Sequence, residues 1–566
     1  MPQPTGHRKL LEQIRADGVG TMFGNPGSSE EGLLDEIARF PDLRYVLGLQ
    51  EAAVVGMADG YAQATHRPAV VQLHCSVGLG NAIGSLFHAR QRRSPLVVIA
   101  GEAGIGEGML EAHMSADLVA MARPVTKYAA RAEHPASLLR LFRRCFKVAA
   151  TPPFGPVFLS VPQDILDAVN EEPVVPTQVP STRVVPEPAL IAAAAEMLGA
   201  ARRPVILMGD GVAHSGATEE IGRLAETIGA GVWGEMSSEL NMPWDHPLYC
   251  GLAGHMFGHD SARIVAEADA VLIVGTYVFP EVFPLLTNPF NADAKVIHVD
   301  LDAYAIGKNH PVTLGLVSDP KLTLHALADV LSDGASEAQR QAVKERAEAI
   351  GARNRDALAR ARAADEAQAN AVPLHMTSFA AELARHLPED AIVFDESLTH
   401  FPELVRWVVP VRPGSFFQTP GGTLGVGIPG AIGVKLARPE QTVIGLTGDG
   451  GAMYTYQALW TAAHLGVGAK FIVCNNRSYR LLKINLVDYW RARGLDPSEF
   501  PATFPPPFDV DTPPIDFVML AKSMGVPGVR VEEPAEMAPA IRRMLETDGP
   551  FLIDLILERD VPRGTT

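Results

Sequence analysis

Two oxygen-bearing side chains, Asp449 and Asn476, stand 27 residues apart in the C-terminal third of the chain. Each lies within two residues of the end of a β-branched, apolar stretch, at 442–447 and at 470–474. Carboxylate and amide oxygens are donors that Mg²⁺ accepts in proteins, and the ion completes its octahedral shell with phosphate oxygens and water. The pair therefore predicts a site for Mg²⁺, or for Ca²⁺, that anchors a phosphorylated ligand.

The segment between these two residues has the pattern of a strand, a helix and a second strand. Both apolar stretches are typical of buried parallel strands, and between them we expect a glycine turn at 448–451 and a helix at 454–465. Ligands bind at the carboxyl ends of such strands, and the turn glycines let a diphosphate approach backbone N–H groups. The Gly-Asp-Gly motif alone is not specific, because Asp210 lies in a second copy and the residue 27 positions after it is Ser237.

Three candidate catalytic residues lie in the N-terminal third. Glu51 begins a helical pattern directly after a strand pattern, so its carboxylate either lies at a strand's carboxyl end or only complements the helix dipole. His74 ends an apolar stretch; it is either a hydrogen-bonded core residue or a proton-transfer group, since histidine titrates unaided near neutral pH. Ser28 N-caps the helix expected from residue 30, faces a ligand, or does both.

The order of patterns along the chain predicts a fold of the α/β class with three doubly wound parallel sheets. Short apolar stretches alternate with helical patterns, and 566 residues exceed what one core holds. The expected domains are 1–172, 191–340 and 374–560. A proline-rich linker at 170–190 separates the first two, and a charged helix at 337–364 leads to the third.

The composition excludes several classes of partner. A formal net charge of −17 disfavours nucleic acid and anionic membranes, and 47% hydrophobic with 20% charged residues is ordinary for a globular protein. No apolar stretch reaches the roughly 18 residues of a membrane span, and the N-terminus lacks the apolar core of a signal peptide. The widely separated cysteines, which predict reduced thiols and a cytoplasmic location, are Cys75, Cys145, Cys250 and Cys474.

Three N-terminal motifs, taken with the spacing of Asp449 and Asn476, carry a resemblance to a known family. They are FGNPGSSE at 23–30, LGLQEAAVVGMADGYAQ at 47–63 and LHCSVGLGNAIG at 73–84. The chain resembles the thiamin diphosphate (ThDP)-dependent 2-oxo acid decarboxylases and acetolactate synthases, and within them the benzoylformate decarboxylases most. The resemblance covers nearly the whole chain, is weakest in the middle third, and implies pyrimidine-binding, central and diphosphate-binding domains in that order.

The resemblance implies roles for individual residues. Glu51 is expected to bond N1′ of the aminopyrimidine and so promote proton loss from the thiazolium, with His74 as the active-site histidine and Ser28 at the substrate carboxylate. The implied metal ligands are Asp449, Asn476 and the carbonyl of Ser478. The implied cofactor-binding residues are Thr399, Gly422, Leu424, Asp449, Gly450, Gly451, Tyr454 and Asn476.

The substrate pocket is where the chain departs from the family. By the resemblance, the pocket takes Leu481, Leu482, Asn485, His400 and Val282. A second catalytic histidine is expected at the position of Val282, with Glu281 beside it, and the segment after Asn476 is longer than the family's. Proton transfer during catalysis then depends on His74 alone, or is shared with His400 or Glu281.

We therefore expect a ThDP- and Mg²⁺-dependent carbon–carbon lyase that decarboxylates a benzoylformate-like 2-oxo acid to an aldehyde, with carboligase side activity. Acetolactate-synthase-like carboligation and 2-hydroxyacyl-CoA cleavage stay open, as does binding of FAD or a nucleotide by the central domain. A catalytically inactive binding protein is the remaining alternative, and its signature would be the loss of Glu51. The expected partners are a small 2-oxo acid and further copies of this chain, in a homodimer at least and a homotetramer by family habit.

Overall fold

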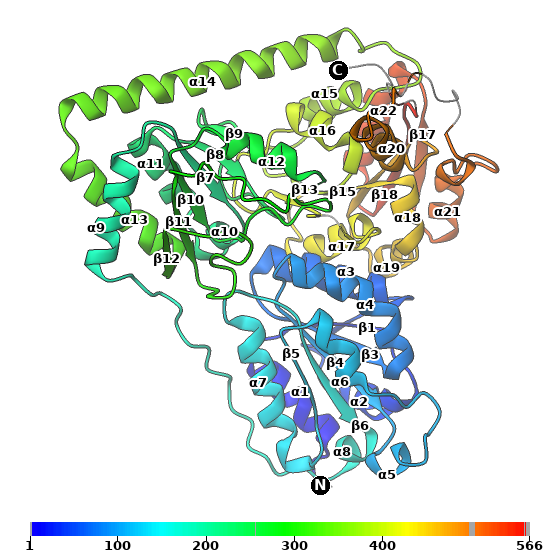
Figure 1. Ribbon diagram of the computed structural model, residues 1–566. Coiled ribbons are helices and arrows are strands. Elements are labelled where there is room, and N and C mark those ends of the chain that lie inside the picture. Colours follow the sequence, from blue (N-terminus) through cyan, green and yellow to red (C-terminus); the bar gives the residue numbers. More distant parts are fainter. Residues whose placement is uncertain are drawn as a thin grey trace.

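Three parallel six-stranded sheets form the framework of the described part of the chain. The computed structural model describes residues 3–559 and 561, except 255, 421, 497 and 499–503. Figure 1 shows the N-terminal domain below, the central domain at upper left and the C-terminal domain at upper right. The prediction of an α/β fold with three doubly wound sheets is confirmed.

The N-terminal sheet has the strand order β2-β1-β3-β4-β6-β5, with every neighbouring pair parallel. All seven side chains of β4 are buried, as expected of a strand covered on both faces by helices. The strands are β1 Thr21–Gly24, β2 Arg44–Leu47, β3 Ala69–His74, β4 Leu96–Glu102, β5 Tyr128–Arg131 and β6 Val157–Pro162. The helices are α1 Gly6–Ala16, α2 Glu31–Ile37, α3 Glu51–Thr65, α4 Cys75–Gln91, α5 Ile105–Gly108, α6 Leu118–Ala122, α7 Leu138–Ala150 and α8 Gln163–Asp167.

The central sheet has a different order, β12-β11-β10-β7-β8-β9. Counted from its own first strand this is the 3-2-1-4-5-6 order of dinucleotide-binding folds, although no ligand follows from the order alone. The strands are β7 Pro204–Met208, β8 Gly231–Gly234, β9 Tyr249–Leu252, β10 Ala270–Val274, β11 Lys295–Asp300 and β12 Leu314–Val317. The helices are α9 Pro188–Gly199, α10 Gly211–Ser215, α11 Thr218–Ile228, α12 Gly258–Val265 and α13 Pro320–Gly334.

The C-terminal sheet has the order β14-β13-β15-β16-β18-β17. Its central strands β15 and β16 are the two apolar stretches that flank the predicted metal site. The strands are β13 Ile392–Glu396, β14 Phe416–Gln418, β15 Val443–Gly448, β16 Lys470–Asn475, β17 Gly528–Val531 and β18 Phe551–Ile556. The helices are α15 Met376–His386, α16 Phe401–Trp407, α17 Gly427–Ala437, α18 Asp449–Thr455, α19 Ala458–Leu465, α20 Arg480–Ala492, α21 Phe517–Ser523 and α22 Pro534–Glu546.

Two connections of opposite character join the domains. Residues 170–187 contain neither helix nor strand, as the proline-rich sequence predicts. The second connection contains helix α14, Glu337–Glu366, whose 30 residues extend about 45 Å and cross the top of the molecule in Figure 1. Only Gly351 and Asp365 of this helix are buried, so the prediction of a charged, solvated connector is confirmed.

The N-terminal and C-terminal domains are held together by helices α3 and α17. A methyl group at Gly433 would lie 1.9 Å from the carbonyl oxygen of Met57, and one at Gly60 would lie 2.2 Å from that of Gly430. Both distances are far below van der Waals contact, so the two backbones approach this closely only because glycine carries no side chain. The apolar residues of both helices belong to one core shared by the two domains.

Two local predictions, and one of the alternatives for Ser28, are wrong. The expected glycine turn at 448–451 is instead the start of α18, because Gly448 has the extended backbone of an N-cap and Asp449 takes the first helical position, where its charge complements the helix dipole. The helix expected at 454–465 is correspondingly divided between α18 and α19. Ser28 caps no helix, since Glu30 holds the N-cap position of α2.

Among the described residues, no helix is both long and apolar enough to cross a membrane.

Candidate active site

The three predicted metal ligands lie together at the carboxyl edge of the C-terminal sheet. Asp449 follows β15, and Asn476 and Ser478 follow the neighbouring strand β16. The backbone N–H of Ser478 donates to Asn476 Oδ1 at 3.0 Å and to Asp449 Oδ2 at 3.3 Å. This shared donor fixes the two side-chain oxygens on one side of the edge.

The donor set fits a divalent cation. Asp449 is 4% exposed, and none of the ion pairs among the described residues involves it. Burial raises the pKa of this carboxyl to about 6, although backbone N–H groups oppose the shift. A buried carboxylate without a cationic side chain, beside an amide oxygen, is the oxygen-rich environment that Mg²⁺ or Ca²⁺ occupies. Asp449, Asn476 and the carbonyl of Ser478 are therefore the residues that would hold the metal and, through it, a diphosphate.

A buried glutamate that the sequence prediction missed braces the neighbouring glycine-rich loop. Glu396, at the end of β13, accepts hydrogen bonds from the N–H groups of Gly425 at 2.5 Å and Gly427 at 2.7 Å, and from Thr447 Oγ1 at 2.9 Å. Burial raises its pKa to about 7, while these three donors act in the opposite direction. The loop that carries Gly422 and Leu424 is thus anchored at its C-terminal end.

The carboxyl edge of the N-terminal sheet positions Glu51. Gln50 N-caps α3 by accepting a hydrogen bond from the N–H of Ala53, which places Glu51 in the first turn as predicted. The Glu51 carboxylate accepts one hydrogen bond from Asn25 at 3.1 Å and one from Asn81 at 3.0 Å. Two amide donors hold the carboxylate in one orientation and leave it able to accept a further proton donor.

His74 does not stand alone. Its Nδ1 lies 3.0 Å from Glu30 Oε2 and 3.1 Å from Ser29 Oγ, and Ser29 also donates to Glu30 at 2.7 Å. Burial raises the pKa of Glu30, with Ser29 and His74 opposing the shift. A methyl group at Gly27 would lie 2.2 Å from the His74 ring, so the turn before Ser28 packs directly on the imidazole. Glu30 was missed as a functional residue because nothing in its local sequence links it to His74.

Comparisons with known proteins agree with this geometry. Three family models match: the N-terminal TPP binding domain of thiamine pyrophosphate enzymes at residues 4–121, their central domain at 191–327 and their C-terminal TPP binding domain at 404–555. The benzoylformate decarboxylase of Pseudomonas aeruginosa is 32% identical over 558 residues, covering 97% of this chain and 98% of that protein. The chain belongs to the thiamine pyrophosphate enzymes.

Two further relatives come from different branches of the family, one a decarboxylase and one a probable acetolactate synthase. A solved structure of the thiamine diphosphate-dependent 4-hydroxybenzoylformate decarboxylase of Rhodococcus jostii RHA1 matches with a TM-score of 0.84 at 29% identity, covering 98% of this chain and 99% of that one. A probable acetolactate synthase large subunit of Methanococcus aeolicus is 26% identical, covering 98% of this chain and 92% of that protein. The resemblance inferred from the motifs is confirmed, and the chain is an enzyme of the carboxy-lyase type.

The remaining predicted cofactor residues of this thiamine pyrophosphate enzyme lie around the two edges. Thr399 is half-buried in the 3₁₀ turn Leu398–His400, directly after β13. Gly422 has φ +100°, which favours glycine, and lies on the segment between β14 and α17. Gly450 and Gly451 are buried in α18, whereas Tyr454 is 55% exposed and Ser28 is exposed as well.

The predicted substrate-pocket residues of the enzyme divide into two groups. His400 is buried beside the metal edge, with its Nε2 3.3 Å from Asn476 Nδ2. Leu481, Leu482 and Asn485 lie on α20, where Leu482 is exposed and the other two are half-buried. Val282 is 60% exposed. Positions 497 and 499–503 of the long segment after Asn476 lie outside the described residues.

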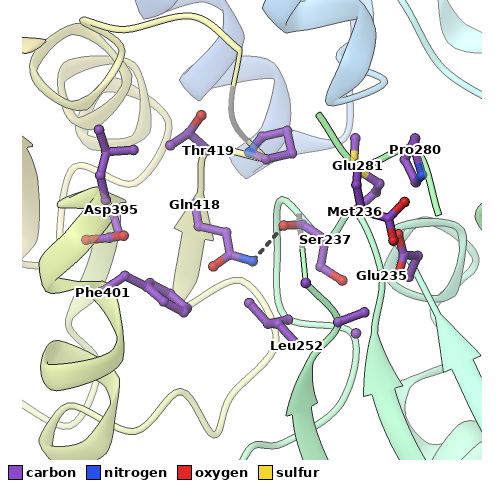
Figure 2. Close-up of a pocket in the computed structure, with 15 residues that line it drawn as sticks. Glu235, Met236, Ser237, Leu252, Pro280, Glu281, Asp395, Phe401, Gln418 and Thr419 are labelled. Carbon is purple, nitrogen blue, oxygen red and sulfur yellow. Dashed lines mark hydrogen bonds between the residues drawn. The ribbon is translucent and has the colours of Figure 1, made fainter. Parts of the chain in front are cut away.

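A cavity of about 130 Å³ lies between the central and C-terminal domains of the enzyme, beside Glu281. Figure 2 shows Glu235, Met236 and Glu281 on one wall, Asp395 and Phe401 on the other, and between them the hydrogen bond from Gln418 to the carbonyl of Ser237. Glu281, rather than Val282, lines this cavity, and neither of its carboxyl oxygens has a hydrogen-bond partner among the described residues. Burial and the neighbouring Glu281 raise the pKa of Glu235 well above its usual value.

Proposed function

We propose that this thiamine pyrophosphate enzyme decarboxylates an aromatic, benzoylformate-like 2-oxo acid to the corresponding aldehyde. One proton is consumed for each CO₂ released, because the carbon that loses the carboxylate must gain a hydrogen. When bound, ThDP would supply the nucleophilic carbon and the electron sink that decarboxylation of a 2-oxo acid requires. The residues of the chain bind and orient the substrate and the cofactor, and they protonate the carbon that has lost CO₂.

The observation that carries the proposal is the contact between His74 and the buried Glu30 at the same sheet edge as Glu51. A carboxyl group on Nδ1 fixes the orientation of the imidazole and leaves its Nε2 free to deliver the required proton. Glu51 lies in the first turn of α3, the helix that follows β2. There its carboxylate would stabilise the charged tautomer of an aminopyrimidine. Ser28 precedes this cluster in the chain, and in this proposal it meets the substrate carboxylate.

The assembly that we propose brings the Glu51 edge of one chain to the Asp449 edge of another, in a homodimer or a dimer of such dimers. Its support is the exposure of Ser28, Tyr454 and Leu482, which flank the two edges and are uncovered in the single chain. Mg²⁺ or Ca²⁺ would bridge Asp449 and Asn476 to the diphosphate. A cytoplasmic location remains our prediction from the four free cysteines, three of which are buried.

The test is a substrate panel on the purified protein with ThDP and Mg²⁺. Aryl, branched and short 2-oxo acids are supplied in parallel, and CO₂ and aldehyde are measured in each reaction. We expect one CO₂ and one aldehyde per aryl substrate consumed, with kcat/KM for benzoylformate at least tenfold above that for pyruvate. Turnover of pyruvate alone, with acetolactate as product, would overturn the proposal.

Carboligation is the second candidate, and the exposed Val282 favours it. The position expected to carry a second histidine holds a side chain that transfers no proton, so an added aldehyde competes better for the reacting carbon. We expect 2-hydroxy ketone beside the aldehyde when acceptor aldehyde is present, and a lower ratio of ketone to aldehyde in Val282→His. An unchanged ratio in Val282→His would leave the segment after Asn476 as the determinant of product. Release of product from an added 2-hydroxyacyl-CoA would instead favour the third candidate, 2-hydroxyacyl-CoA cleavage.

A further inference from the structure

A second cluster of metal-ligating side chains lies where the three domains meet, at the opposite end of α3 from Glu51. It consists of His66, His214 and Glu239, whose ligand atoms all lie within 4.8 Å of one another. His66 follows α3 of the N-terminal domain, and His214 lies on α10 of the central domain. Glu239 belongs to the segment after β8, and its backbone forms a bridge to Phe417 of the C-terminal domain.

The two carboxylate–imidazole distances within this cluster are close to the edge length of a metal-centred tetrahedron. Glu239 Oε1 lies 3.2 Å from His66 Nε2 and 3.1 Å from His214 Nε2. Bonds of about 2.0–2.1 Å to a tetrahedral Zn²⁺ separate neighbouring ligand atoms by about 3.3 Å. An ion can therefore replace the two shared hydrogens with small movements of the side chains, because both imidazoles already direct Nε2 at the same carboxylate.

The surroundings hold the ligands in place and leave room for a fourth. Asp210 accepts hydrogen bonds from the N–H groups of Ser238 and Glu239, which anchors the segment that carries the carboxylate. His66 has φ +50°, a conformation that costs energy in a non-glycine residue and that often marks a functional position. A cavity of about 670 Å³ is lined by His66 and Glu239, so water reaches the open side of the cluster.

We propose that His66, His214 and Glu239 form a binding site for a transition-metal ion of the Zn²⁺ class, with a water molecule as the fourth ligand. Two imidazole nitrogens and one carboxylate oxygen suit Zn²⁺ or Co²⁺, whereas Mg²⁺ and Ca²⁺ prefer an all-oxygen set such as the one at Asp449. The bound ion joins the C-terminal end of α3, whose first residue is Glu51, to the central domain. This site is independent of the proposed decarboxylase activity.

The test uses the full-length protein saturated with ThDP and Mg²⁺, so that the site at Asp449 is occupied. Co²⁺ is titrated while its visible absorption is recorded, because four-coordinate Co²⁺ absorbs far more strongly than the six-coordinate ion. Zn²⁺ retained after gel filtration is measured in parallel. We expect one tightly held ion per chain, the intense four-coordinate spectrum, and a rise in Tm on adding Zn²⁺.

Three histidine variants, one of them a control, decide the assignment. His66→Asn keeps a residue that tolerates the left-handed conformation but cannot reach the carboxylate, and we expect it to lose at least nine-tenths of the bound ion. His246→Asn changes a histidine that lines the same cavity and contacts Glu226 at 3.3 Å, and we expect it to bind as the wild type does. His214→Gln repeats the test on the second imidazole, and it decides the question if His66→Asn does not fold. Equal uptake by the wild type and the folded variant, or no uptake by the wild type, would overturn the proposal.

Discussion

The N-terminal and C-terminal sheets have the same topology but different chemistry at their carboxyl edges. Counted from the first strand of each domain, both orders are 2-1-3-4-6-5. The third strand of the N-terminal sheet ends in His74, whereas the third strand of the C-terminal sheet is followed by Asp449. The second strand leads to Glu51 in one domain and to the loop of Gly422 and Leu424 in the other.

The topology of the sheet therefore determines where a site can form, at the carboxyl edge, and the residue types at that edge determine its chemistry. The N-terminal edge gathers the groups that we propose for proton transfer, Glu51 and the pair of His74 with Glu30. The C-terminal edge gathers the oxygens that we propose as cation ligands, at Asp449 and Asn476. Two copies of one topology thus divide the proposed work between proton transfer and anchoring of a phosphorylated cofactor.

Loss of the C-terminal anchor has the largest expected effect. In Asp449→Ala the diphosphate loses its bridging metal, so ThDP should be lost on gel filtration and activity should fall below detection. The matched control is Asp210→Asn, in the central Gly-Asp-Gly motif, where the carboxylate binds Ser238 and Asn241 instead. We expect this control to lower Tm and keep ThDP affinity, which calorimetric titration measures. Unchanged ThDP affinity in Asp449→Ala would show that the C-terminal edge does not anchor the cofactor through Asp449.

The next largest effect is expected at the N-terminal edge. Glu51→Gln retains a hydrogen-bonding side chain but cannot stabilise the charged tautomer, so kcat should fall about 10²- to 10⁴-fold while ThDP still binds. Hydrogen–deuterium exchange at the thiazolium C2 measures this step directly. The control, Glu102→Gln, changes another buried glutamate at a strand end of the same sheet, paired with Arg131, and should leave the exchange rate unchanged. Equal exchange in wild type and Glu51→Gln would remove Glu51 from the mechanism.

A smaller effect is expected from Glu30→Gln. The amide keeps a contact with His74 but no longer offers a carboxyl group that fixes the imidazole, so kcat should fall roughly tenfold to a hundredfold, within the range for a proton-transfer residue. KM should change little, because the substrate carboxylate is expected to contact Ser28 instead. A role limited to packing would lower Tm without changing the ratio of aldehyde to 2-hydroxy ketone, and that ratio is the deciding measurement.

The smallest expected effect is on stability at the opposite end of the C-terminal sheet. Lys470 begins β16 and is 4% exposed, with Nζ bonded to the carbonyls of Thr547 and Gly549; the equivalent strand of the N-terminal sheet begins with Leu96. Burial lowers the pKa of Lys470 to about 8 from 10.5.

The unfolded chain therefore binds more protons than the folded chain between about pH 8 and 10.5, and stability contributed by the neutral amine is lost as the pH falls through 8. The total change is of order 3 kcal/mol at most. Urea unfolding at pH 7 to 10 should show a shallower pH dependence in Lys470→Met than in the wild type. The exposed Lys344→Met should leave the slope unchanged, and an identical slope in Lys470→Met would show that Lys470 does not titrate there.

The sequence predicted what depends on neighbours along the chain. Buried β-branched stretches predicted the strands, and the helical pattern that begins at Glu51 predicted a carboxylate at a helix start. Contacts that depend on strand order escaped prediction: Glu30 meets His74 only because β1 and β3 are adjacent, and Glu396 meets Gly425 across 29 residues. The glycines after Asp449 also misled, because they continue a helix whose N-cap is Gly448. Domain boundaries and residue roles remain predictions.

The packing of α3 on α17 also has a consequence for synthesis of the protein. Gly60 and Gly430, which meet there, are 370 residues apart, so at 5–20 residues per second the ribosome needs roughly 20 to 75 s to supply the partner helix. Until then α3, which is buried on nearly all sides in the finished fold, exposes an apolar surface on the nascent chain. The N-terminal domain is therefore most vulnerable to aggregation and most dependent on chaperones before residue 427 is made.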